Sequence, residues 1–67
     1  MNKDILEGKW KQLKGAVQHE WGDLTNDEVD QVDGDMERLS GLIQERYGKS
    51  RQEAEKAIED WYRSQSL

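Results

Sequence analysis

Few residues of this 67-residue chain stand in a pattern that could support catalysis. The segment His19-Glu20-Trp21-Gly22-Asp23 resembles the start of a helical motif in which two histidines, four residues apart, bind zinc. Asp23 takes the place of the second histidine, the chain has no other histidine, and a catalytic zinc site needs three protein ligands. His19 is therefore expected to be a surface side chain, and no metal site is predicted.

A second candidate is the acidic segment 21–37, which has seven acidic and no basic residues in a chain of net charge −5. A calcium-binding EF-hand loop needs oxygen ligands at its first positions, glycine at the sixth and glutamate at the twelfth. With Gly34 placed sixth, Val29 is first and Ser40 is twelfth, so the segment does not match. We expect a solvated helix start, where the helix dipole favours acidic side chains. Its charge would repel nucleic acids and anionic membranes and attract cations or basic partners.

The sequence also lacks the residue patterns of other common catalytic and binding sites. The chain has no cysteine and no glycine-rich phosphate loop, and no histidine is placed near its serines in the sequence. We therefore predict no enzymatic activity, no cofactor and no small-molecule substrate. No apolar run approaches the ~18 residues of a membrane span, and the N-terminus lacks the apolar region of a signal peptide. These features predict a cytoplasmic protein without membrane contact.

A nucleic-acid site would have its best residues at Lys9, Trp10 and Lys11, since basic side chains beside an aromatic ring can hold a single strand. Trp10, however, falls on an apolar helix face with Leu6 and Leu13, which predicts a core position. The acidic balance of the chain also opposes binding to phosphates. Nucleic-acid binding is not expected.

The positions of these residues depend on an internal repeat. Residues 8–22 return 26 positions later as residues 34–48. The identical positions are Gly8/Gly34, Leu13/Leu39, Gly15/Gly41, Gln18/Gln44 and Gly22/Gly48. Each copy is followed by a capping-box signal, Thr25…Glu28 or Ser50…Glu53. The repeat predicts an all-α fold, a bundle of three to four helices built from two helix-turn-helix units.

The apolar periodicity predicts helices at about 3–20, 26–47 and 51–63 of a single domain spanning 1–67. Asn2 is the expected N-cap of the first helix, and Gly22 and Gly48 are expected to end the first two. The unbroken apolar phase from Val29 to Tyr47 favours one continuous middle helix. Asp33-Gly34-Asp35 consists of poor helix formers, which leaves a kink at 33–35 as the alternative. A bend there would give two α-hairpins packed across each other.

Gly15 and Gly41 occupy matching positions in the middle of predicted helices, where alanine would favour the helix more. Glycine inside an element commonly permits close approach of another backbone. We predict that both lie where helices cross. The alternative is close approach of a ligand or partner.

The chain resembles the CsbD-like family of small bacterial general-stress proteins. The resemblance covers nearly the whole chain and is carried by residues 1–4, 8–15, 21–27 and 41–48, with sequences MNKD, GKWKQLKG, WGDLTND and GLIQERYG. It implies a cytoplasmic, all-helical stress-response protein with no known enzymatic activity and no catalytic residues to transfer.

Two hypotheses for the function follow. The first is a hydrophilin-like protectant that keeps other proteins soluble during water loss. The second is a module that docks the helix of a protein partner in a groove. A protectant should leave no sizeable apolar surface in solvent, whereas a docking module should expose a contiguous one. Tyr62 cannot share the helix face of its neighbour Trp61, which makes it the candidate partner surface.

Overall fold

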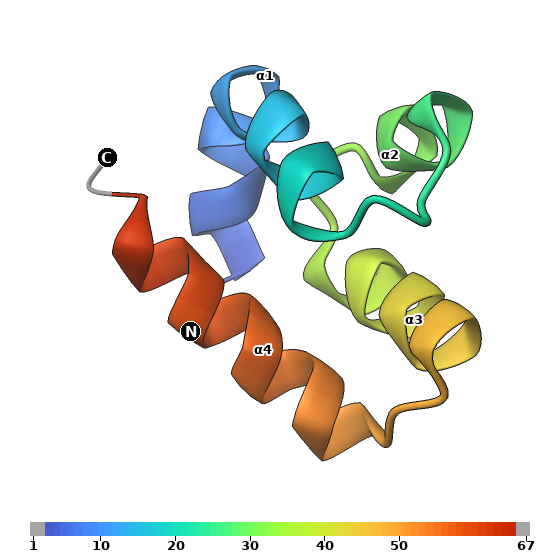
Figure 1. The fold of residues 1–67 in the computed structure, drawn as a ribbon. Coiled ribbons are helices and arrows are strands. Elements are labelled where there is room, and N and C mark those ends of the chain that lie inside the picture. The colour runs from blue at the N-terminus through green and yellow to red at the C-terminus, as the bar shows by residue number, and fades with distance from the viewer. Residues whose placement is uncertain (1–2, 66–67) are drawn as a thin grey trace.

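The fold consists of four helices in two layers, in a computed structural model that describes residues 3–65. The helices are α1 (Lys3–Glu20), α2 (Asn26–Val32), α3 (Met36–Tyr47) and α4 (Arg51–Ser64). Helices α1 and α2 form one layer and α3 and α4 the other (Figure 1). The predicted all-α class and the arrangement of two helix-turn-helix units are confirmed. The predicted N-cap Asn2 lies outside the described residues.

Capping boxes begin the second helix of each unit, as the sequence predicts. The Thr25 hydroxyl accepts a hydrogen bond from the Glu28 amide at 3.1 Å, and the Glu28 carboxylate accepts one from the Thr25 amide at 3.0 Å. Ser50 and Glu53 form the same pair of bonds at 3.1 and 2.8 Å. Each box pairs two backbone amides that have no partner within the helix, which fixes where α2 and α4 start.

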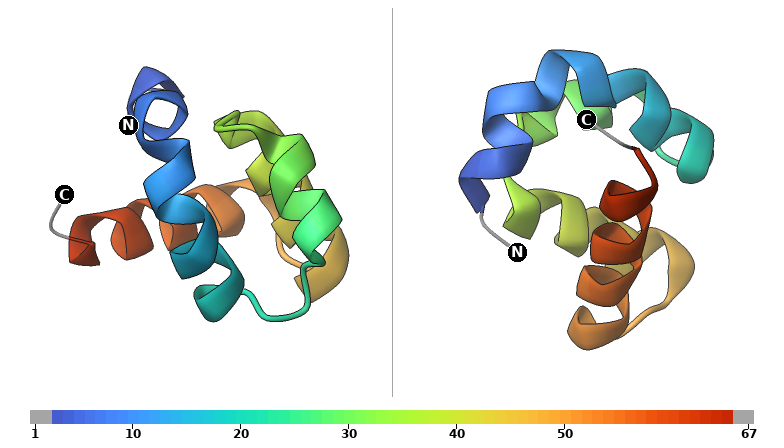
Figure 2. Two further views of the ribbon diagram at one scale, coloured as in Figure 1. Left: turned by 90° about the horizontal axis from the view of Figure 1, so that it is seen from above. Right: turned by 90° about the vertical axis from the view of Figure 1, so that its left-hand side faces the viewer.

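The middle of the chain is broken, so the prediction of one continuous helix over 26–47 is wrong. Asp33 ends α2 in the left-handed conformation (φ 49°), and Gly34 follows with φ 81°. The Asp35 side chain then caps α3 by accepting hydrogen bonds from the Glu37 and Arg38 amides. The alternative, a bend at 33–35, is the observed arrangement. It places the second unit across the first (Figure 2).

The close backbone contact lies at Gly34 and not at the two glycines for which it was predicted. A Cβ added to Gly15 or Gly41 would meet no heavy atom within 4 Å, because both positions face open space. A Cβ on Gly34 would lie 3.0 Å from the backbone nitrogen of Glu7 and 3.2 Å from its Cβ. The turn between the two units therefore packs directly on the backbone of α1.

Replacing Gly15 or Gly41 by alanine is expected to stabilise the protein by about 0.5–1 kcal/mol each, since alanine favours a helix interior and nothing obstructs the methyl group. The free energy of unfolding, measured by urea denaturation, checks this. A loss of stability in either variant would show that the space around the glycine is occupied.

The two helix ends at glycine differ from each other. Gly48 ends α3 in the left-handed conformation (φ 64°), as expected. Gly22 does not adopt a positive φ, which corrects the expectation for the end of α1. The turn there closes through a hydrogen bond from the Leu24 amide to the Trp21 carbonyl at 3.1 Å.

The core lies between the layers and receives side chains from every helix. Its buried members are Leu6, Trp10, Leu13, Val17, Trp21, Leu24, Val29, Val32, Met36, Leu39, Ile43, Ala54, Ile58 and Trp61. Trp10 is a core residue, as predicted, with 6% of its surface exposed. Near the ends of α1 and α4, the rings of Trp21 and Trp61 meet edge to face with centroids 5.3 Å apart. This contact joins the two units just after the C-terminal end of α1, whereas the Gly34 turn packs on Glu7 near the N-terminal end of α1.

Candidate interaction surface

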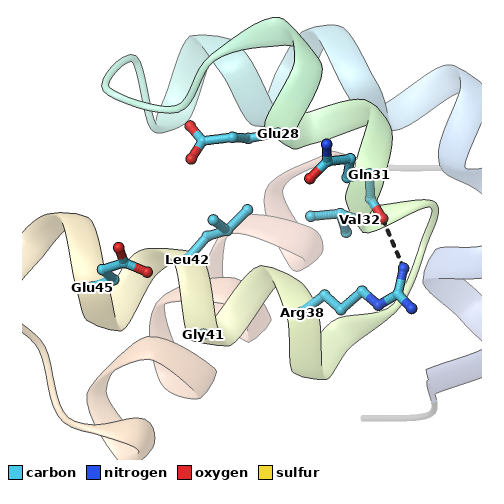
Figure 3. A pocket seen from close by; sticks show the side chains of 7 residues that line it. All are labelled: Glu28, Gln31, Val32, Arg38, Gly41, Leu42 and Glu45. Atoms are coloured by element: carbon cyan, nitrogen blue, oxygen red, sulfur yellow. Dashed lines mark hydrogen bonds between the residues drawn. The ribbon is translucent and has the colours of Figure 1, made fainter.

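A pocket of about 350 Å³ opens between α2 and α3, the two helices that flank the helix break (Figure 3). Its lining residues are Glu28, Gln31, Val32, Arg38, Gly41, Leu42 and Glu45. Val32 and Leu42 project toward each other from the two helices, and Gly41 leaves the adjacent part of α3 without a side chain. Glu28 and Glu45 lie at one end and Arg38 at the other. We call this the α2–α3 pocket.

The acidic end of the pocket is fixed by contacts between the two units. Arg46 of α3 forms an ion pair with Glu28 and donates a hydrogen bond to the Asp23 carbonyl at 3.0 Å. The Tyr47 hydroxyl accepts a hydrogen bond from the Asp23 amide at 3.1 Å. Since Glu28 also belongs to the capping box, one side chain connects the start of α2 to the end of α3. This arrangement holds the two walls of the pocket at a set separation.

The other end is closed by Arg38, whose guanidinium donates a hydrogen bond to the Gln31 carbonyl at 3.0 Å. Arg38 also lies 4.0 Å from the carboxylate of Asp35. The positive charge of Arg38 therefore lies beside the helix break. Glu45 differs, because no hydrogen bond or ion pair engages its exposed carboxylate within the part of the chain that the structure describes.

The hydrogen bond from the Thr25 backbone amide, together with the Thr25 hydroxyl and the Arg46 charge, holds the pKa of Glu28 below its ordinary value, against a smaller opposing effect of burial. Bonds from the backbone and hydroxyl of Ser50 lower the pKa of Glu53 in the same way. These contacts favour the charged form of both carboxyl groups.

This has a consequence for stability in acid. Both carboxyl groups have a lower pKa when folded than when unfolded, so the unfolded chain binds more protons and stability falls as the pH drops below about 4.3 and through the folded pKa values. The double variant Glu28→Gln, Glu53→Gln should show a weaker loss. Urea midpoints at neutral and acidic pH measure the difference. Equal pH dependence in the two proteins would contradict the assignment.

The residues singled out in the sequence lie elsewhere. Tyr62, the candidate partner surface, is half-buried and packs against the core, with its ring tilted on that of Trp61 at 6.4 Å. His19 is exposed, as expected. Of the two glycines, Gly41 lines the α2–α3 pocket and Gly15 does not. The structure therefore does not bring Tyr62 and the glycines into one site.

Sequence reasoning missed the α2–α3 pocket because it treated α2 and α3 as one helix. One signal was present. Leu42 extends the apolar face beyond the side that Met36 and Ile43 occupy, since adjacent residues such as Leu42 and Ile43 lie about 100° apart around a helix, and it directly follows a glycine in the middle of a helix. An apolar side chain off the core face indicates a second apolar surface.

The part of the chain that the structure describes also lacks two other features. Among its described side chains, those of residues 6–65, no group of three or more histidine, cysteine, aspartate or glutamate residues is placed to hold a metal ion. None of its helices combines the length and apolar character needed to cross a membrane.

The fold and the surface define a class, the small all-α proteins made of two helix-turn-helix units with a charged exterior. Within it, the CsbD-like family model matches residues 4–56. The chain belongs to the CsbD-like family.

Its relatives cover almost its full length. A UPF0337 protein of Bordetella pertussis is 50% identical over 62 residues, which are 92% of this chain and 94% of the relative. A UPF0337 protein of Pseudomonas aeruginosa is 49% identical over 61 residues, 91% of this chain and 94% of the relative. The UPF0337 protein YjbJ of Escherichia coli K12 is 49% identical over 61 residues, 91% of this chain and 88% of the relative. None of these names states an activity. No solved structure matches the chain.

Proposed function

We propose that this protein is a non-enzymatic, hydrophilin-like protectant of the bacterial cytoplasm that keeps other proteins soluble during water loss. The observation that carries the proposal is the distribution of apolar side chains. Among residues 6–65, every apolar or aromatic side chain is buried or half-buried. Exposed apolar surface was the feature that separated a protectant from a docking module, and this stretch has no fully exposed apolar side chain.

The composition of the surface supports the same function. Charged residues make up 37% of the chain, and the mean hydropathy is −1.17. Such a surface holds water strongly and, with a net charge of −5, resists self-association as the solution concentrates. A protein of this kind can separate molecules that would otherwise aggregate without binding any of them tightly.

The test is to dry a desiccation-sensitive enzyme with and without this protein and to measure the activity recovered on rehydration. We expect recovery to rise with the amount of added protein and to exceed that given by an equal mass of ubiquitin, a folded protein of similar size and lower net charge. Recovery no better than with ubiquitin would overturn the proposal, because the effect would then be that of any small protein.

A further inference from the structure

We propose that the α2–α3 pocket binds one apolar side chain of a basic segment of another protein, with a lysine or arginine of that segment beside Glu45. The inference goes beyond the protectant function and does not depend on it. It rests on the shape of the pocket, the absence of a side chain at Gly41 and the charges at its rim.

The shape of the pocket suits a single large side chain. Its volume of about 350 Å³ lies at the lower end of the range for ligand pockets. Leu42 provides the apolar wall that a partner could contact, since Val32 opposite it is only 1% exposed (Figure 3). Leu42 packs against the core but is only half-buried, so part of its surface remains available for a contact.

Gly41 provides the space. A glycine in the middle of a helix costs about 1 kcal/mol relative to alanine, and here no neighbouring backbone requires it. An added Cβ would meet nothing within 4 Å, so a larger residue would project into the opening. The chain gives up helix stability at the position where a side chain would reduce the pocket.

The charges select a basic partner. Glu28 and Glu45 line one end of the pocket and Arg38 the other, and α2 carries two more acidic residues, Asp27 and Asp30, outside the lining. Arg46 neutralises Glu28 and Lys14 neutralises Asp30, whereas Glu45 has no charged partner among the described residues. The segment 21–37, with seven acidic residues and no base, includes the loop before α2, α2 itself, the break and the start of α3. This potential repels nucleic acids and anionic membranes and attracts cationic peptides.

A second copy of the chain fits the pocket less well. Two copies would bring net charges of −5 together, and like charges disfavour association at low salt. A basic segment of a different protein has the complementary charge, and an apolar residue within it supplies the contact with Leu42.

The experiment is a proton–nitrogen NMR titration of the full chain with a short peptide of leucines and lysines, repeated with a peptide in which glutamate replaces each lysine. The lysine peptide should shift amides of α2 and α3 that surround the pocket. The glutamate peptide should bind at least about tenfold more weakly, a difference of roughly 1.4 kcal/mol. A low-salt buffer keeps the charge contribution measurable.

Two pairs of variants localise the site. Gly41→Leu should weaken binding of the lysine peptide about tenfold by filling the pocket, whereas Gly15→Leu, at the matching repeat position, should change it less than about twofold. Both substitutions place a good helix former in open space, so both variants should fold. Glu45→Lys should weaken binding similarly, while Glu20→Lys, with the same change in net charge outside the pocket lining, should have a small effect.

Equal effects of Gly41→Leu and Gly15→Leu would overturn the proposed location. Equal binding of the lysine and glutamate peptides would overturn the basic partner. Concentration-dependent shifts of the same amides without any peptide would assign the pocket to a second copy and overturn the proposal as well.

Discussion

Gly34→Ala is expected to lose about 2–4 kcal/mol of folding free energy, enough to unfold much of the protein at room temperature. A domain of this size commonly has a net stability of about 3–5 kcal/mol, so the loss is comparable to the whole. Circular dichroism and urea denaturation would show a reduced helical signal or a midpoint near zero denaturant.

Two costs combine at Gly34. Its φ of 81° is a backbone angle that residues with a side chain rarely adopt, and forcing alanine into it alone costs about 1 kcal/mol. The second cost is steric, since the new Cβ would lie 3.0 Å from the Glu7 nitrogen, and helix backbone cannot move aside as a flexible side chain can. Relief would require α1 to separate from the turn that joins the two units.

Gly48→Ala is the matched control. Gly48 also has a positive φ, 64°, but an added Cβ there would meet nothing within 4 Å. It should lose about 1 kcal/mol and keep its fold. Similar losses in the two variants would mean that the contact between Gly34 and Glu7 contributes little.

The helix break shows why periodicity alone was insufficient. Val29, Val32, Met36 and Leu39 keep helical spacing across the break because both helices bury their apolar faces in the same core. The spacing is thus compatible with one helix or with two. Local chemistry decides, since Asp35 can cap a new helix and Gly34 can take the left-handed conformation. These signals were visible in the sequence and were outweighed by the phase.

The role of each glycine could not be read in the same way. The repeat pairs Gly8 with Gly34, yet Gly8 lies inside α1 with nothing within 4 Å of an added Cβ, and Gly34 touches the backbone of α1. Close approach depends on how the two units pack, and the order of residues along the chain does not specify that packing. The capping boxes, by contrast, act within four residues and were predicted correctly.

In the candidate site, too, the features set by local sequence could be predicted and those set by helix packing could not. Glu28 was recognised as a capping residue from local sequence, but its ion pair with Arg46 spans 18 positions and depends on the packing of α2 against α3. The pocket exists only because the chain turns back at Asp33 and Gly34. Tyr62 was chosen from helix geometry on α4 alone, and in the fold it packs against the core beside Trp61.

Trp61→Ala is expected to destabilise the protein by about 3–5 kcal/mol, the usual cost of removing a buried tryptophan. Trp61 is 5% exposed and makes the edge-to-face contact with Trp21 that joins α4 to the end of α1. Its loss removes apolar burial, leaves a cavity and ends a ring contact worth about 0.5–1.5 kcal/mol. In a protein of this size the variant should be largely unfolded, as measured by circular dichroism and by loss of dispersed indole resonances.

Tyr62→Ala, one residue away on the same helix, separates core packing from surface contact. Because Tyr62 is only half-buried, its removal should cost about 1–2 kcal/mol and leave the fold intact. Trp61→Phe should fall between the two variants, since a smaller ring keeps part of the contact with Trp21. If Tyr62→Ala were as harmful as Trp61→Ala, α4 would be held through Tyr62 as much as through the tryptophan pair. With the expected order, the two units are held together at one end by the Trp21–Trp61 contact and at the other by Gly34 on α1, and the charged surface between them is free to change.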